Sequence, residues 1–339
     1  MEKLVAVLAV ISVMISGILI HTETSKAAEM NFSVSAVIPD NQIDKSKTYF
    51  ELRMKPNQVQ ELEVVLTNGL ARAVTVETSA NTAVTNDNGI VDYSNKAPKL
   101  DNTLQAPFSK IAEMPSEITV PAKGSKTVKV KVTMPSAPFE GFILGGIHFS
   151  EKDDGDKKES GEGVQIKNKY AYVIGVILSE NDVAVEPDMK LNTIKPDQVN
   201  YRNVLKANLQ NIKPVIIQNL AVEAHVYKEG SDKALYSAKQ DTLRMAPNSN
   251  FDFGIGWNNQ EFKPGKYRLK MVASSGDSVW KWDEPFEIKG DTAADLNDKA
   301  VELEKDYTMW YVAGGVLLAL LVFGLVFWLG RRSRKREED

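Results

Sequence analysis

The sequence predicts an all-β protein built from two tandem β-sandwiches, followed by a single apolar helix. Three observations between residues 32 and 290 support the β assignment. Apolar and polar residues alternate over short runs, which places the apolar side chains on one face of a pleated strand. Turn dipeptides separate the runs, and no stretch shows helical periodicity of convincing length. Many short strands with frequent turns are typical of sandwiches and barrels.

The clearest alternation lies in the first half of the chain. Apolar residues occupy every second position from Leu62 to Leu66 and from Val128 to Val132. Dipeptides that favour tight turns lie between such runs, namely Asn68-Gly69, Asn88-Gly89, Lys123-Gly124 and Pro264-Gly265. Each run is therefore predicted to be one half-buried strand of an antiparallel sheet.

Two strongly apolar runs bear on the boundary between the sandwiches. Phe142–Phe149 and Tyr170–Leu178 both read as strands, and the charged stretch Glu151–Gly163 between them lacks any large apolar residue. The economical interpretation is one long hairpin with an exposed loop, which gives a first sandwich over residues 29–180. The alternative places the boundary inside the loop 151–163.

The second sandwich is predicted over residues 181–290. Its clearest strand candidates are Val204–Leu209, Ile216–Tyr227, Lys266–Ala273 and Val279–Ile288. In the last of these, Trp280, Trp282 and Phe286 share one face, which favours a core role over an exposed aromatic strip.

A weak internal echo suggests that the two sandwiches are related. Leu62–Asn68 and Leu205–Asn211 both follow the pattern L-x-small-x-L-x-N, and a turn with a further β-branched strand comes after each. Two immunoglobulin-like sandwiches in tandem would produce such a repeat.

The N-terminal segment has the layout of a cleavable signal peptide over residues 1–27. Lys3 precedes the apolar run Leu4–Ile20, and small residues occupy the peptidase positions Ser25 and Ala27. The chain has no cysteine, which suits a protein exported by a Gram-positive bacterium without a disulfide framework.

The C-terminal segment predicts a single membrane span. A stalk is expected over 291–308 and a transmembrane helix over 309–330, since no charged residue interrupts Met309–Leu329. The basic tail 331–339 is expected to be cytoplasmic because positive charges favour that side. The prediction is therefore a single-pass protein of the cell membrane, with its N-terminal region extracellular.

The sequence gives no catalytic constellation. The histidines beyond the signal region, His148 and His225, lie far apart, each within a predicted strand. No thiol, phosphate-binding, dinucleotide or zinc-protease motif is present. We therefore predict a protein that is not an enzyme and needs no cofactor or metal. The net charge of −4 also argues against nucleic acid as a partner.

Two segments have features that could indicate a ligand site. Asn86–Asp92 resembles a calcium-binding loop in its Asn and Asp content but lacks the D-x-D-x-D-G order. A turn before a strand is therefore the favoured interpretation. Gly141–Phe149 places three glycines in one strand, which indicates either close sheet packing or close approach of a ligand. Close packing is the favoured alternative.

The same segments resemble the WxL-interacting cell-surface proteins of low-GC Gram-positive bacteria. The resemblance covers essentially the whole chain and is carried by Tyr49–Leu52 with Lys55-Pro56, Thr67-Asn68, Thr85–Tyr93, Gly141–Ile147, Tyr172–Val176 and Leu209–Asn211. It implies a peptidoglycan-binding domain followed by a domain that binds host or partner proteins, both immunoglobulin-like. It also implies a partnership with WxL-domain wall proteins in surface assemblies that serve adhesion.

From this we expect a cell-surface scaffold that binds peptidoglycan, WxL-domain wall proteins and host extracellular proteins, with its C-terminal helix in the membrane. Exposed amides and aromatics suit sugar polymers, so the candidate ligand-binding residues are Asn86, Asn88, Tyr93 and Phe142. Two alternatives stay open. A purely structural stalk would have no ligand affinity, and a wall-modifying enzyme would depend on a pair of carboxylates.

Overall fold

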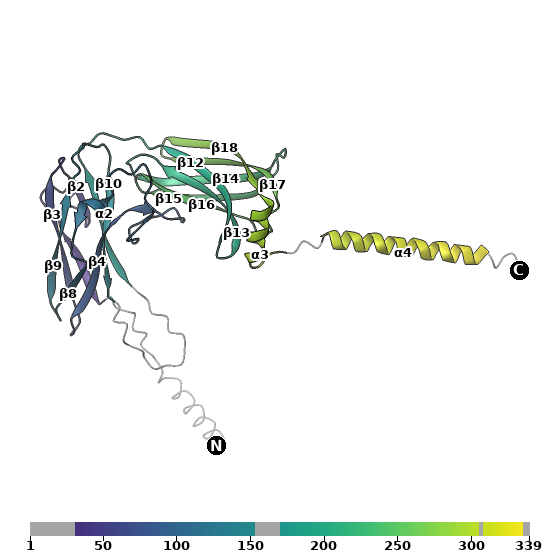
Figure 1. Ribbon diagram of the computed structural model, residues 1–339, viewed down its shortest axis with the longest axis horizontal. Helices are drawn as coiled ribbons and strands as arrows, with labels where there is room; N and C mark the ends of the chain where they lie inside the picture. The colour runs from purple at the N-terminus through teal and green to yellow at the C-terminus, as the bar shows by residue number, and fades with distance from the viewer. Residues whose placement is uncertain (1–30, 153–169, 305–307, 335–339) are drawn as a thin grey trace, which may run out of the picture. The chain divides into compact units, whose positions relative to one another are not determined.

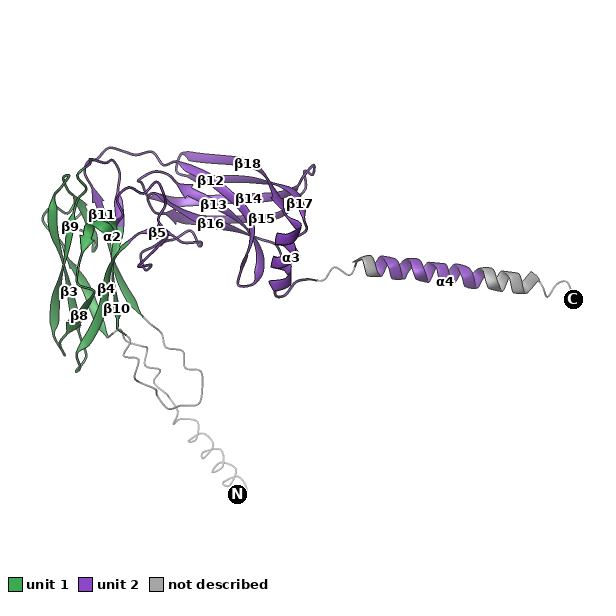
Figure 2. Ribbon diagram, in the orientation of Figure 1, with its two compact units in different colours: residues 1–81, 108–136, 145–177 green, residues 82–107, 137–144, 178–339 purple. Residues whose placement is uncertain are grey.

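The computed structural model describes residues 31–152, 170–304 and 308–334, with side chains over 311–326 in the last stretch. Strands make up 52% of the structure and helices 11%, which confirms the predicted predominance of β-sheet (Figure 1). The immunoglobulin-like assignment stays a prediction. The predicted signal peptide 1–27 and most of the loop 151–163 lie outside the described residues. The chain forms two compact units that interleave along the sequence (Figure 2).

Unit 1 comprises residues 1–81, 108–136 and 145–177. It contains two β-sheets. The first has the strand order β1 (Phe32–Val37), β3 (Val59–Asn68), β9 (Ser125–Thr133) and β7 (Ala112–Glu113). The second has the order β2 (Phe50–Arg53), β11 (Ala171–Ser179), β10 (Ile143–Glu151), β4 (Val74–Thr82) and β8 (Glu117–Val120).

The core of unit 1 follows the alternation that the sequence shows. Leu62 lies opposite Val130 and Val64 opposite Val128 in the register of β3 and β9, and all four side chains are buried. The short helix α2 (Phe108–Ile111) adds Phe108, which is fully buried. A Cβ atom at Gly145 would lie 2.1 Å from Cδ1 of Phe108, so this glycine admits the ring against the sheet. Close packing therefore accounts for a glycine in β10.

Unit 2 comprises residues 82–107, 137–144 and 178–339. One sheet has the order β12 (Met189–Val199), β13 (Arg202–Asn211) and β16 (Ser249–Gly256). The other has the order β15 (Ala234–Met245), β14 (Ile217–Lys228), β17 (Gly265–Ser275) and β18 (Ser278–Ile288). The hairpin of β5 (Val84–Thr85) and β6 (Val91–Asp92) belongs to the same unit.

The two sheets of unit 2 share one hydrophobic core. Phe253 of the first sheet and Leu269 of the second are both buried in it. Trp257 follows β16 and is 1% exposed, and its ring stacks on Tyr236 with 3.9 Å between centroids. Side chains at the edge of the second sheet pack against this core while staying half-exposed, among them Trp280, Trp282 and Phe286. The predicted core role of this aromatic face agrees with the structure.

The echo between β3 and β13 corresponds to a shared hydrogen-bonding device. Asn68 and Asn211, each the last residue of its strand, are buried. In both cases the side-chain oxygen accepts the backbone N–H two residues later, and the amide group donates to the carbonyl four residues later, at 2.7 Å. Buried amides that satisfy a turn in this way fix how the chain leaves the strand.

The helix α3 (Gly290–Lys299) packs against unit 2. Ala293 is buried in the core, and the Asn297 side chain accepts the backbone N–H of Phe262 at 2.8 Å and returns a bond to its carbonyl at 3.0 Å. The backbone N–H of Glu304 also donates to the carbonyl of Asn259 at 2.8 Å. The segment predicted as a stalk over 291–308 is thus part of unit 2 as far as residue 304.

The prediction of a membrane span at 309–330 is contradicted by the structure. Over the residues that the structure describes, no helix combines the length and the apolar character needed to cross a bilayer. The C-terminal helix α4 runs over Thr308–Arg334. The predicted single-pass membrane location is corrected accordingly.

Replacing Gly145 by alanine is expected to destabilise unit 1 by about 1–3 kcal/mol, because the added methyl group displaces the Phe108 ring from a close-packed core. Native-state hydrogen exchange of β10 amides in the full-length protein measures the change. Gly175→Ala in the neighbouring strand β11 is the matched control, since its Cβ would lie 3.9 Å from Tyr49. Equal protection in the two variants would contradict the packing argument.

Candidate functional site

A polar cleft of about 630 Å³ lies in unit 2 beside the sheet β12-β13-β16. Side chains of all three strands line it, together with Asp87 of the β5–β6 hairpin and residues 99–102. The wall is built on the sheet face opposite the core, because the core-facing residues of β13 are Leu205, Ala207 and Leu209. Period-2 alternation therefore directs the intervening polar side chains to the cleft.

A ladder of amide side chains crosses the three strands. Asn192 of β12 donates to Oδ1 of Asn208 in β13 at 3.0 Å. Asn208 in turn donates to Oδ1 of Asn250 at 3.2 Å and to Oδ1 of Asp252 at 2.8 Å, both on β16. Each amide carries both donor and acceptor groups, so the ladder fixes the orientation of its members.

Asp101 connects this ladder to the segment 99–102. Its side chain is 8% exposed and accepts from Gln210 at 2.8 and 3.0 Å and from Asn250 at 2.6 Å. The hydroxyl and backbone N–H of Thr103 donate to the same carboxylate at 2.7 and 2.9 Å. Burial raises the pKa of Asp101, but these hydrogen bonds outweigh it and hold the pKa below its usual value.

Lys206 lies among the other carboxylates near the cleft. Its side chain is 15% exposed, and its ammonium lies 3.2 Å from Asp197, 3.7 Å from Asp87 and 3.9 Å from Asp252. Burial lowers the pKa of Lys206, yet the hydrogen bond and charge of Asp197, with the two other carboxylates, raise it overall. The same hydrogen bond and the charge of Lys206 help to lower the pKa of Asp197 despite its partial burial.

The hairpin β5–β6 is fixed to the strands β15 and β16 by buried contacts. The hydroxyls of Thr85 and Ser249 lie 2.6 Å apart, and the backbone N–H of Ala246 donates to Thr85 Oγ1 at 3.0 Å. At the turn, Gly89 has φ of +68°, and a Cβ there would lie 2.7 Å from Cδ2 of Leu243. Glycine is required here by backbone conformation and by space.

The predicted ligand-binding residues lie outside the lining of the cleft. Asn86 caps the hairpin turn, since its side chain accepts the backbone N–H of Asn88 at 3.0 Å and of Ile90 at 3.2 Å. The Asn88 side chain is exposed, Tyr93 is half-buried, and the Phe142 backbone donates to the Pro214 carbonyl at 2.7 Å. None of the four lines the cleft, and their role in binding stays a prediction.

Sequence reasoning missed the residues that do form the cleft. Asp87 lies between two of the predicted residues, but the amides of β12, β13 and β16 and residues 99–102 carry no motif. The one available signal is the density of Asn, Gln and Asp at alternate positions of β13 and β16. Such alternation is also typical of any solvated sheet face, so it singles out no site.

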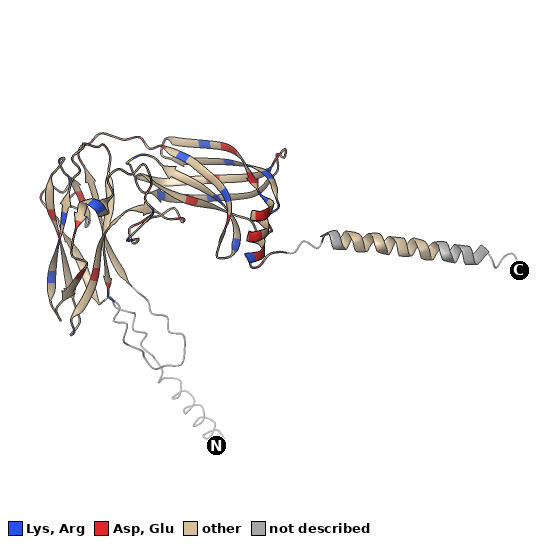
Figure 3. Cartoon of the chain, viewed as in Figure 1, with Lys and Arg blue, Asp and Glu red and all other residues tan. Residues whose placement is uncertain are grey.

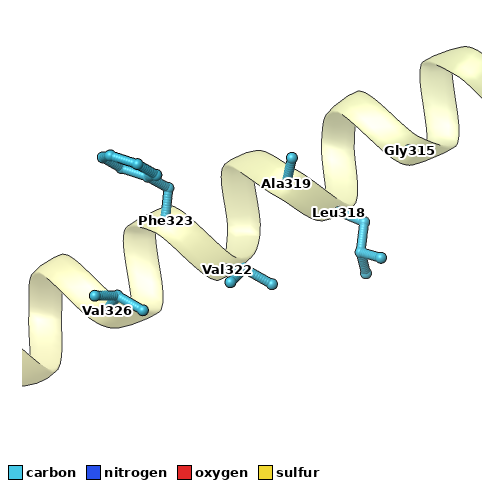
Figure 4. A pocket seen from close by; sticks show the side chains of 6 residues that line it. All are labelled: Gly315, Leu318, Ala319, Val322, Phe323 and Val326. Atoms are coloured by element: carbon cyan, nitrogen blue, oxygen red, sulfur yellow. The ribbon is translucent and has the colours of Figure 1, made fainter.

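Two further features contribute little to a site. Among the residues that the structure describes, no group of His, Asp and Glu could hold a metal ion. An apolar hollow on α4 is lined by residues of that one helix, including Gly315, Ala319 and Phe323 (Figure 4). Basic and acidic residues are interspersed along the strands of both units (Figure 3).

Two β-rich units, one with a cleft lined by hydrogen-bonding groups, place the chain in the class of predominantly β-sheet proteins. Family models identify the group within that class. The WxL Interacting Protein peptidoglycan binding domain matches residues 32–151, and the WxL Interacting Protein host binding domain matches residues 161–298. The chain belongs to the WxL-interacting protein family, as its resemblance predicts. Both matched domains are binding domains.

Comparison with solved structures gives distant similarities only. The CsuC–CsuE chaperone–tip adhesion subunit complex of Acinetobacter baumannii is 13% identical with a TM-score of 0.32, over 75% of this chain and 98% of that chain. The E. coli chaperone DraB is 12% identical with a TM-score of 0.29, over 76% and 98%. These values are too low to support an argument about fold or function. No curated protein matches the chain.

Replacing Asp101 by asparagine is expected to lower the free energy of unfolding of unit 2 at pH 7 by about 1–3 kcal/mol, because an amide group then faces the donors of Gln210 and Asn250. Chemical unfolding of the full-length protein, followed by tryptophan fluorescence, measures this. Asp241→Asn, at an exposed position of β15, is the matched control.

The wild type and the Asp101→Asn variant also give a test of pH dependence. The folded-state pKa of Asp101 is lowered, so its contribution is complete above the unfolded pKa of about 3.9 and is lost as the pH falls toward the folded value. The stability gap between wild type and Asp101→Asn should therefore narrow below about pH 4. A gap that stays constant down to strongly acidic pH would contradict the ionised state of this carboxylate.

Proposed function

We propose that this protein is a cell-surface scaffold that binds peptidoglycan, engages WxL-domain wall proteins and presents its second domain to host proteins. The observation that supports this proposal is the order of the two family domains, peptidoglycan-binding at 32–151 and host-binding at 161–298. The chain then carries both a wall-directed and a protein-directed binding function in one polypeptide.

The physical character of the described surface suits binding. The cleft of unit 2 presents amides and carboxylates in a hydrogen-bonded array, and Lys206 forms an ion pair with Asp197 beside it. The edge strands β1 and β12 carry backbone groups of the kind that a partner protein can extend by strand addition. A scaffold needs both kinds of surface, because it must hold a polymer and a protein at once.

The test is co-sedimentation of the full-length protein with purified peptidoglycan, alongside capture on an immobilised WxL-domain wall protein. We expect the protein to pellet with the glycan, to be retained by the wall protein and to release no soluble glycan. Pelleting in the absence of peptidoglycan is the control for self-association.

Each failure has a distinct meaning. Retention by the wall protein without pelleting would contradict the peptidoglycan function and leave a protein–protein scaffold. Failure of both would favour the structural stalk, which has no ligand affinity. Release of soluble glycan would show an enzyme and overturn the proposal.

A further inference from the structure

The cleft presents hydrogen-bonding groups that the fold leaves available. Within the described part of the chain, the Thr193 hydroxyl and the Lys99 ammonium make no hydrogen bond, and Asn192 uses its amide nitrogen while its Oδ1 stays unpaired. All three side chains are exposed and line the cleft. A ligand in the cleft would therefore meet both donors and acceptors without breaking the network beneath them.

A β-bulge places two of these groups side by side. The pairing of β12 with β13 shifts between Leu191 and Ile194, so that Asn192 and Thr193 together oppose Asn208. β12 is also an edge strand of its sheet. A bulge at a sheet edge redirects side chains and interrupts the ladder, and such bulges are frequent at functional sites.

The balance of groups selects a class of ligand. The lining carries three aspartates, Asp87, Asp101 and Asp252, against the two lysines Lys99 and Lys195, so an anionic ligand would meet a net negative formal charge. A protein ligand would need an apolar pocket for an anchoring side chain, and the large apolar residues of the lining are only Leu100, which is half-buried, and Phe251, which is 2% exposed. A neutral ligand rich in hydroxyl and amide groups needs the mixture of donors and acceptors that the amide ladder supplies.

The segments of the chain that supply the lining also favour a glycan as the ligand. Asp87 and residues 99–102 lie within the span 32–151 that matches the peptidoglycan-binding domain, yet they belong to unit 2. The remaining lining residues come from the span 161–298. The cleft is therefore a composite of both matched segments.

We propose that this composite cleft binds a neutral, N-acetylated glycan strand, with Asn192, Thr193 and Asn102 contacting its hydroxyl and acetamido groups. The proposal rests on the proposed function, because it names the place where the peptidoglycan glycan is held. It assigns glycan recognition to unit 2, through the segment that residues 82–107 contribute.

The experiment compares the full-length wild type with Asn192→Ala/Thr193→Ala and with Asn102→Ala. All three positions are exposed, so the substitutions leave the core intact. Lys190→Ala on β12 and Gln240→Ala on β15 are matched controls, because both residues are exposed and lie outside the lining. The probes are purified peptidoglycan, by pelleting, and the N-acetylglucosamine oligomer chitotetraose, by amide chemical shifts.

The double variant is expected to lose about tenfold in apparent affinity for peptidoglycan, as the loss of one or two net hydrogen bonds implies, while both controls match the wild type. Chitotetraose should shift amides of β12 and of residues 99–102. Thermal unfolding of each variant confirms that the fold is retained.

The outcomes separate the two proposals. If the wild type pellets and the cleft variants pellet equally, the cleft assignment is overturned while the proposed function stands. If the wild type does not pellet, the proposed peptidoglycan function fails. The chemical-shift experiment with chitotetraose then tests on its own whether the cleft binds an N-acetylated glycan. If the β12 amides do not shift at about 10 mM chitotetraose, the cleft assignment is overturned, because the dissociation constant is then weaker than about millimolar. Shifts confined to unit 1 would also overturn it.

Discussion

The site in unit 2 depends on one buried carboxylate. Burying an ionised group is costly unless hydrogen bonds compensate, and Asp101 receives them from Gln210, Asn250 and Thr103. The first two donors come from β13 and β16, whereas the third follows Asp101 in its own turn. This arrangement holds residues 99–102 beside the sheet, and the space left between them is the cleft. The shape of the site thus follows from the cost of an unsatisfied charge.

The path of the chain follows from the same interactions. Residues 82–107 leave the strands of unit 1 and fold with unit 2, where Thr85, Gly89 and Asp101 find buried partners. The linear limits 29–180 and 181–290 stay a prediction for the domains, but compact units that interleave along the sequence have no single boundary. Hydrogen bonds between residues more than 100 positions apart produce this interleaving, and local sequence patterns do not report them.

The sequence was informative where a strand lies at a sheet centre and alternates cleanly, as β3 and β9 do. It was silent on β12 and β15, two edge strands that bury few side chains and lack an alternating apolar pattern. The residues of the candidate site could not be predicted from the sequence either. Its amides lie on strands that come together only in the folded sheet, whereas Asn86 and Asn88 stood out because they sit in a recognisable turn. That turn proved to be a backbone device in which Asn86 accepts local N–H groups.

A cleft of this chemistry implies a particular mode of binding. Hydrogen bonds to a neutral ligand replace those to water, so each contributes only about 0.5–1.5 kcal/mol net. The lining offers no exposed aromatic ring for stacking, because Phe251 is buried. A single sugar unit would therefore bind weakly, and useful affinity must come from a ligand that repeats. A polymer held at several points gains through effective concentration, without any stronger contact. Weak contacts to a repeating polymer also exchange readily, so the proposed scaffold would bind many equivalent positions along a glycan in turn.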